Sequence, residues 1–159
     1  MVGRNILSSP IEKTTNQIIG TTTTQLRYEK TTYNLFSNIY LPQKIEVKPG
    51  SGILITAITF DGYDASGNLT GYTPTDGLKT TLTYYGTSDL GKVNLLKTQT
   101  NNLGHTTTYN YLPLVGLSLI TDPNGRTASY SYDTFNRLNN IKDANGKIIK
   151  SYQYNYFNQ

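Results

Sequence analysis

The chain has 159 residues, 36% of them hydrophobic and 15% charged, and a formal net charge of +4 at pH 7. Thr, Asn, Tyr and Gly occupy 69 positions (25, 16, 14 and 14 residues), and because these types favour strands or tight turns, the composition predicts an all-β chain and argues against a helical bundle. The lack of cysteine excludes disulfides, thiolate metal sites and cysteine nucleophiles, and the scattered Lys and Arg residues argue against nucleic acid as a partner.

The N-terminal segment has no continuous apolar run, so it is not expected to act as a secretory signal. The longest largely apolar stretch, residues 112–120, is interrupted by Pro113 and Gly116. A membrane-spanning helix needs about 20 apolar residues. No membrane span is therefore expected.

We predict that residues 1–52 form a diverged, strand-rich N-terminal segment that belongs to the same sheet as the rest of the chain. Strand-like stretches occupy residues 25–33 and 43–47, and the Pro- and Gly-rich residues 48–52 predict a turn after them.

The most hydrophobic strand candidate covers residues 53–60, with the sequence ILITAITF. Because side chains alternate along a strand, its apolar residues divide between two faces. One face carries Ile53 and Ile55, and the other carries Leu54, Ile58 and Phe60. This pattern predicts a strand that is buried on both sides.

Residues 53–159 predict repeated β-hairpins, because glycines and tyrosines recur along them at regular spacing. Gly104, Gly125 and Gly146 follow one another at intervals of 21 residues, and a Tyr-x-Tyr pair comes after each. Isolated hairpins are marginal in water, so the units are expected to pair into one antiparallel meander that forms a curved, open sheet. The predicted units lie near residues 61–85, 85–111, 111–132 and 132–156.

Two kinds of turn are predicted within each unit. Asn-Gly dipeptides such as Asn124-Gly125 and Asn145-Gly146 are typical of two-residue type I′ turns, which need positive φ angles. A second turn follows the tyrosines in YDASGNL (residues 63–69) and YDTFNRL (residues 132–138), where Gly67 or Asn136 can adopt the left-handed conformation.

The tyrosine pairs are the main chemical feature of the chain. Strand alternation puts Tyr109 with Tyr111, and Tyr130 with Tyr132, on one side of their strands, so successive units are expected to form an aromatic stripe. The stripe can pack neighbouring hairpins together, or it can bind glycans by stacking sugars on exposed rings. Arg137 can stack on such a ring as a cation–π partner. These five residues are the candidate binding residues, and packing is the favoured interpretation.

No catalytic site, metal site or cofactor is predicted. His105 is the single histidine, so neither a His-based metal site nor a Ser-His-Asp triad can form within one chain, and we expect this residue at an exposed strand end. The acidic residues stand mostly beside Gly or Asn, where Asp accepts hydrogen bonds from its own backbone. Phosphate-binding G-x-G-x-x-G spacing is absent. The chain is therefore not expected to be an enzyme.

The segments YDASGNL and YDTFNRL, each followed by a polar run, resemble the Rhs repeat, which is also called the YD repeat. Tyr132, Asp133, Arg137 and Leu138 fit its Tyr-Asp-x-x-Gly-Arg-Leu pattern, and Asn136 replaces the glycine. In the first segment, Tyr63-Asp64, Gly67 and Leu69 fit, and Asn68 replaces the arginine. The resemblance is strong over residues 120–156, moderate over 61–111 and weak before that.

The resemblance implies a β-sheet ribbon that spirals into a hollow shell, as in bacterial polymorphic toxins, insecticidal toxin complexes and animal teneurins. Such shells enclose a toxic cargo or present an adhesive surface, and carbohydrate binding is attributed to the repeats. The units present here would form a partial shell. The family's autoproteolytic aspartate site is not matched, because Asp122 lies in an ordinary repeat turn.

The function expected from these features is that of a non-enzymatic structural module of a secreted or cell-surface protein, in scaffolding or cargo encapsulation. The alternative is a carbohydrate-binding or adhesion module. The expected partners are adjacent repeats of a longer chain, or a second copy associated edge to edge, with glycans as further candidates.

Overall fold

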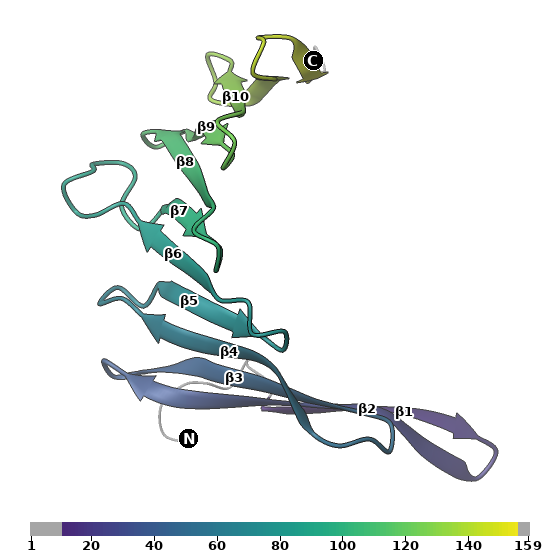
Figure 1. Cartoon of the computed structure of the whole chain (residues 1–159). Helices are drawn as coiled ribbons and strands as arrows, with labels where there is room; N and C mark the ends of the chain where they lie inside the picture. Colours follow the sequence, from purple (N-terminus) through teal and green to yellow (C-terminus); the bar gives the residue numbers. More distant parts are fainter. Residues whose placement is uncertain (1–10, 156–159) are drawn as a thin grey trace. The chain divides into compact units, whose positions relative to one another are not determined.

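The computed structural model describes residues 11–155, and the regular secondary structure in this range is entirely β (Figure 1). No helix long and apolar enough to span a membrane occurs among these residues. The strands are β1 (Glu12–Ile19), β2 (Thr22–Phe36), β3 (Ile39–Pro49), β4 (Ile55–Tyr63), β5 (Leu69–Pro74), β6 (Thr80–Tyr84), β7 (Leu96–Thr100), β8 (Thr106–Leu112), β9 (Gly116–Thr121), β10 (Thr127–Tyr132), β11 (Leu138–Lys142) and β12 (Ile148–Ser151).

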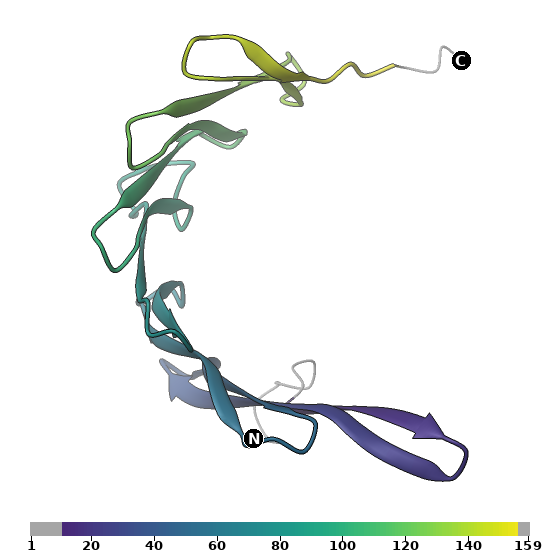
Figure 2. The same cartoon turned by 45° about the vertical axis from the view of Figure 1, so that its right-hand side comes forward.

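The strands hydrogen bond to one another in chain order, from β1 to β12, and the neighbouring strands pair in antiparallel fashion. Every connection is therefore a hairpin connection, as Figure 2 shows for the succession of strands within each half of the chain. The predicted all-β antiparallel meander is confirmed, with β1 and β12 at the two ends of the strand order.

The chain divides into two compact units inside β6. The first unit, Met1–Thr81, contains the longest strands, and its β2 pairs with β1 over Thr22–Lys30 and with β3 over Arg27–Phe36. The second unit, Leu82–Gln159, contains shorter strands of four to seven residues.

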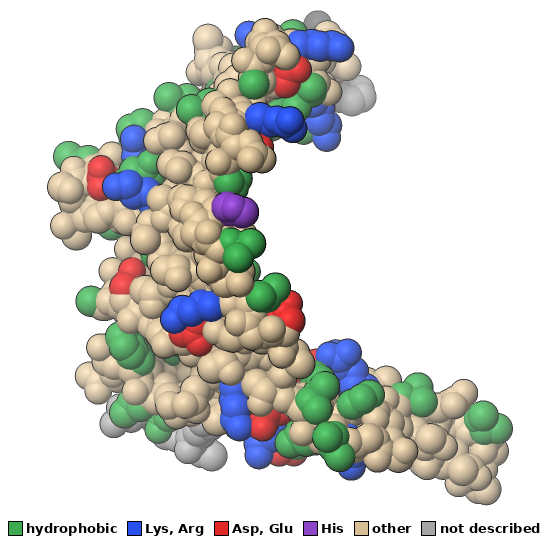
Figure 3. All heavy atoms as spheres, viewed as in Figure 1, with side chains coloured by type: hydrophobic (Ala, Val, Ile, Leu, Met, Phe, Trp, Pro, Cys, Tyr) green, Lys and Arg blue, Asp and Glu red, His purple; other side chains and the backbone are tan. Residues whose placement is uncertain are grey.

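Burial is slight throughout the described residues, because no second layer of strands or helices covers the strands of either unit. Within residues 11–155, Tyr85, which is 8% exposed, is the one hydrophobic side chain that is buried, and Thr80 is the one buried polar side chain. Figure 3 shows a face on which polar side chains and backbone predominate and hydrophobic side chains form small separate groups.

The prediction that residues 53–60 form a strand buried on both faces is wrong. The strand begins at Ile55 rather than Ile53, and Ile53 is 80% exposed. Leu54 and Ile55 are also exposed. An apolar run indicates burial on both faces only where something packs on both faces, and nothing in the first unit does so here.

One five-residue turn recurs in the chain and replaces the predicted type I′ turns. An Asp or Asn side-chain Oδ1 accepts hydrogen bonds from the backbone N–H groups two and four residues later, at 2.8–3.0 Å. The residue three positions later has a positive φ, and its N–H donates to the carbonyl of the Asp or Asn. The turns begin at Asp64, Asn101, Asp122, Asp133 and Asp143.

This geometry is a type I turn closed by a left-handed residue, the usual three-residue hairpin loop. A type I′ turn needs positive φ at both central residues, whereas Gly125 and Gly146 have φ of 78° and 77° and the preceding Asn124 and Asn145 do not have positive φ. Asn136 occupies the left-handed position of the Asp133 turn with φ 60°. The predicted role of Asp as a backbone hydrogen-bond acceptor in the turns is confirmed.

Candidate functional site

Among the described residues, three tyrosines at or just beyond strand ends bond through their hydroxyls to the backbone of the preceding strand. The Tyr132 hydroxyl at the end of β10 donates to the Leu117 carbonyl on β9 at 2.7 Å. The Tyr63 hydroxyl at the end of β4 donates to the Pro42 carbonyl on β3 at 2.6 Å. We call each such contact, from a tyrosine hydroxyl to the carbonyl of the preceding strand, a tyrosine clamp. A third clamp joins Tyr154, just after β12, to the Leu138 carbonyl at 2.9 Å.

Each acceptor carbonyl belongs to a residue where the strand register shifts. Leu138 pairs with Tyr132 at a shift after Ser131, and Leu117 pairs with Tyr111 at a shift after Asn110. Pro42 likewise pairs with Tyr33 at a shift. Such bulges leave a residue outside the ladder of backbone hydrogen bonds. The tyrosine hydroxyl therefore supplies a donor at the place where the ladder is interrupted.

The clamps of the second unit join segments that lie at the same end of the strands. Tyr132 immediately precedes the Asp133 turn, and its acceptor Leu117 follows the turn between β8 and β9. Leu138, directly after the Asp133 turn, pairs with Tyr132 and accepts from Tyr154. The Tyr132 clamp thereby joins the β8–β9 turn to the Asp133 turn, and the Tyr154 clamp joins the Asp133 turn to the segment after β12.

Gly116 leaves the space that the Tyr132 clamp occupies. The backbone pairs between β9 and β10 end at Leu119 and Ser129, and the Tyr132 side chain continues the contact beyond that point. A Cβ atom at Gly116 would lie 2.6 Å from the Tyr132 hydroxyl oxygen and 3.1 Å from the adjacent ring carbon. Burial raises the pKa of Tyr132, so the phenol stays protonated and keeps its donor.

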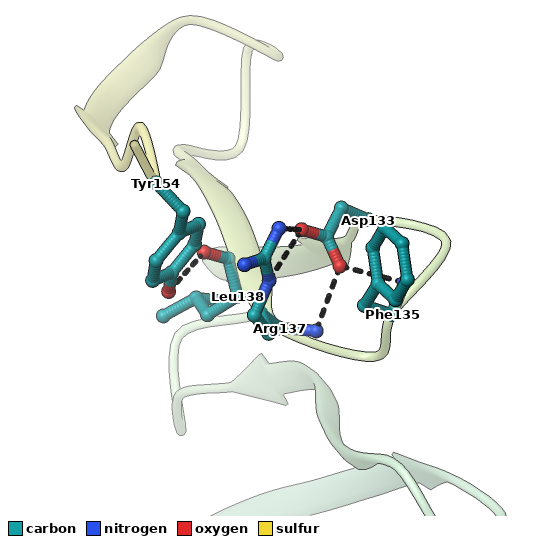
Figure 4. A network of polar contacts seen from close by, with 5 residues as sticks. All are labelled: Asp133, Phe135, Arg137, Leu138 and Tyr154. Atoms are coloured by element: carbon teal, nitrogen blue, oxygen red, sulfur yellow. Dashed lines mark hydrogen bonds and ion pairs between the residues drawn. The ribbon is translucent and has the colours of Figure 1, made fainter. Parts of the chain in front are cut away.

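Arg137 lies between an acidic and an aromatic partner in the turn that follows Tyr132 (Figure 4). Its Nε and Nη2 atoms donate to Oδ2 of Asp133 at 2.8 and 2.6 Å. Its guanidinium carbon is 4.3 Å from the ring centroid of Tyr154 and 5.2 Å from that of Phe135. Arg137 stacks on rings outside the predicted stripe, and its contact with Tyr154 ties the Asp133 turn to the next clamp tyrosine.

Hydrogen bonding stabilises the charged form of two turn aspartates. The side-chain hydrogen bond from Arg137, followed by the backbone N–H of Arg137, lowers the pKa of Asp133 below its ordinary value. The pKa of Asp64 is also lowered, mainly by the side-chain hydrogen bond from Asn68. These two aspartates directly follow the clamp tyrosines Tyr132 and Tyr63.

The strand register places the predicted tyrosine stripe on one face of the second unit. Tyr109 faces Ile120, and Ile120 faces Ala128, two residues before Tyr130 on the same strand. Tyr109 lies 3.4 Å from the Gln99 side-chain oxygen, and Tyr111 packs edge-on against Tyr85 at 6.0 Å. Tyr109, Tyr111, Tyr130 and Tyr132 are all half-buried.

His105, which sequence reasoning set aside as a site residue, lies in a structural position. His105 is exposed and directly precedes β8, with its N–H bonded to Asn101 Oδ1. In the part of the chain that the structure describes, no group of three or more His, Cys, Asp or Glu residues could hold a metal ion.

A cavity of about 350 Å³ beside Tyr63 was not expected from the sequence. Phe36, Phe60 and Tyr63 form its aromatic part, and the rings of Phe36 and Tyr63 are 6.1 Å apart. Its polar lining residues are Asn34, Gln43 and Asp61. These residues come from β2, β3 and β4. The regular glycine spacing lies in the second half of the chain, so it gives no information on how these three strands pair.

Comparison with known proteins identifies a repeat in the second unit. Residues 116–148, which contain β9, β10, β11 and the Asp133 turn, match the family described as RHS Repeat. The resemblance found in Tyr132–Leu138 is thereby confirmed. A search of curated proteins found no match.

Two solved structures are similar to most of the chain. One is described as the crystal structure of TcdB2-TccC3, with 10% identity and a TM-score of 0.30 over 83% of this chain. The other is that of TcdB2-TccC3-Cdc42, with 11% identity and a TM-score of 0.25 over 84% of this chain. The chain spans 10% of the length of each.

We predict that Tyr132→Phe lowers the free energy of unfolding by about 1 kcal/mol, because it removes one hydrogen bond and leaves a partly buried carbonyl without its donor. Tyr130→Phe is the matched control on the same strand and is expected to change stability by less than about 0.5 kcal/mol. Urea unfolding followed by circular dichroism measures both. Equal losses in the two variants would contradict the clamp.

The lowered pKa of Asp133 predicts a pH-dependent contribution to stability. Because the folded-state pKa lies below the unfolded value, this contribution is present above the unfolded pKa of about 3.9 and is lost as pH falls through the folded pKa. Asp133→Asn keeps the turn acceptor, as Asn101 does, but removes the charge. We expect this variant to be less stable than the wild type near neutral pH and equally stable in strong acid. A stability difference that stays constant with pH would rule out the charge as its cause.

Proposed function

We propose that this chain, which carries an RHS repeat at residues 116–148, is a non-enzymatic structural module whose hairpins form part of the wall of a larger scaffold or enclosure for cargo. The observation that carries the proposal is the series of tyrosine clamps. The repeat that contains Tyr132 takes a carbonyl acceptor, Leu117, from the strand before it and offers another, Leu138, to Tyr154 after it. By resemblance to the family, we place the parent protein outside the cell or at its surface.

The acceptors support this proposal because they are backbone atoms. Leu117 and Leu138 have the same side chain and Pro42 has a different one, yet all three present a carbonyl to a clamp. Repeats joined in this way can be added in number while most of their side chains vary, as in other repeat proteins whose units contact mainly their neighbours.

The lack of a covering layer is a second support. Within each unit the described strands leave both faces of the sheet accessible, with half-buried residues on most strands rather than a core. A sheet that separates two compartments needs two accessible faces, one toward its contents and one toward the outside.

Limited proteolysis of the complete natural protein that contains residues 1–159 tests the proposal. We expect segments enclosed by the repeats to resist protease, and Tyr132→Phe to make them cleavable sooner than Tyr130→Phe does. If no segment outside the repeats is protected in the wild type, or if both variants leave its protection unchanged, the enclosure proposal fails.

Glycan binding is the second candidate function, and the cavity beside Tyr63 favours it. Aromatic rings next to amide and carboxylate groups can stack on a sugar and hydrogen bond to its hydroxyls. The stripe residues Tyr109, Tyr111, Tyr130, Tyr132 and Arg137 are the other candidate surface. Of these groups, the Tyr132 hydroxyl already donates to the Leu117 carbonyl and the Arg137 guanidinium already donates to Asp133.

A glycan array with two single variants separates these surfaces. If glycans bind at the cavity, Phe60→Ala should abolish binding and Tyr130→Ala should not. Binding at the stripe predicts the reverse pattern, with circular dichroism confirming the fold of each variant. A wild-type chain that binds no glycan on the array removes this candidate.

A further inference from the structure

The hairpin of β1 and β2 extends beyond the strand next to it. The pairing of β2 with β3 begins at Arg27, so Thr22–Gln25 pair with β1 alone. We call residues 14–26 the arm, and Figure 1 shows it in purple, reaching past the end of β3. Both outer edges of the arm therefore carry backbone groups that no described strand pairs with. A two-stranded ribbon of this kind is marginally stable in water without a further strand.

The arm lacks the features that protect exposed sheet edges. Natural edge strands are short, or carry charges, prolines or inward-pointing lysines that prevent pairing with other chains. No residue between Lys13 and Arg27 is charged or is a proline. All eight residues of β1 are exposed, and Ile18 and Ile19 near the tip are 70% and 69% exposed.

The strand at the other end of the order is different. The four residues of β12 include Lys150, and Lys147 directly precedes the strand. This edge is short and positively charged, so it has the protection that the arm lacks. A head-to-tail contact between β1 of one copy and β12 of another would generate an open filament, and the character of β12 disfavours it.

We propose that β1 is an interaction surface for a second copy of this chain, and that β1 of each copy pairs with the partner's β1 in antiparallel fashion to give a closed dimer. The proposal is independent of the function proposed above. A contact of the same edge with itself has two-fold symmetry and closes after two copies. It turns two marginal two-stranded arms into one four-stranded sheet.

The sequence of β1 is complementary to itself in this arrangement. Two-fold symmetry requires one residue to face its own copy, and one such register places Gln17 opposite the partner's Gln17, Asn16 opposite the partner's Ile18 and Thr15 opposite the partner's Ile19. All five residues are uncharged, the two facing Gln17 amides can hydrogen bond to each other, and the β-branched Thr15 and Ile19 pack across the strands. Glu12 and Lys13 fall outside the apposed segment, so no charge is buried and no like charges meet.

Sedimentation velocity over a range of concentrations tests the proposal. We expect the wild type to form dimers, and the variant Asn16→Lys with Gln17→Lys to weaken dimerisation at least about tenfold, because the two copies of position 17 would then bring like charges face to face, and a further charge would enter the apolar contact at position 16. Ile149→Lys on β12 is the matched control and should leave the dimer intact. Circular dichroism checks that each variant retains its strands.

A charge exchange makes the test independent of folding. The variant Asn16→Glu with Gln17→Glu should also be monomeric, and mixing it with the lysine variant should restore a dimer of the two. A monomeric wild type at high concentration, growth into larger assemblies, disruption by Ile149→Lys alone or no recovery on mixing would each overturn the proposal.

Discussion

The hydrogen bond from a tyrosine hydroxyl to a bulge carbonyl is the interaction on which the repeat structure depends. The described strands have almost no buried core, so hydrophobic burial does not define how successive hairpins lie against each other. Backbone ladders alone stop short, as between β9 and β10, where pairing ends at Ser129. The Tyr132 clamp continues the contact past that end and fixes the position of the next turn.

The two residues of each Tyr-Asp pair have different structural roles. The tyrosine of each Tyr-Asp pair bonds backward to the preceding strand, and the aspartate organises the turn ahead through its Oδ1 atom. Their adjacency couples the end of one strand to the start of the next, so the register of the sheet follows from local chemistry. Arg137 joins both parts, because it bonds to Asp133 and stacks on Tyr154.

Local features were predictable from the sequence and interactions across strands were not. The hairpins and the turn role of Asp133 follow from spacings of a few residues, whereas Arg137 stacks on Tyr154, which lies beyond β12. The bulges depend on which strand pairs with which, so the acceptor role of Pro42 left no signal in the sequence. A carbonyl acceptor leaves the side chain unconstrained. The exposure of Ile53 was missed because an apolar run implies burial only when a second layer is present.

The most direct test of the clamp is amide hydrogen exchange in the Tyr132→Phe variant, read residue by residue. If the hydroxyl holds β9 and β10 together beyond their ladder, protection should fall on those two strands. The amides of Phe135 and Arg137, which bond to Asp133 within the turn, should keep theirs. Unchanged protection on β9 and β10, or a uniform loss over the whole second unit, would contradict this account.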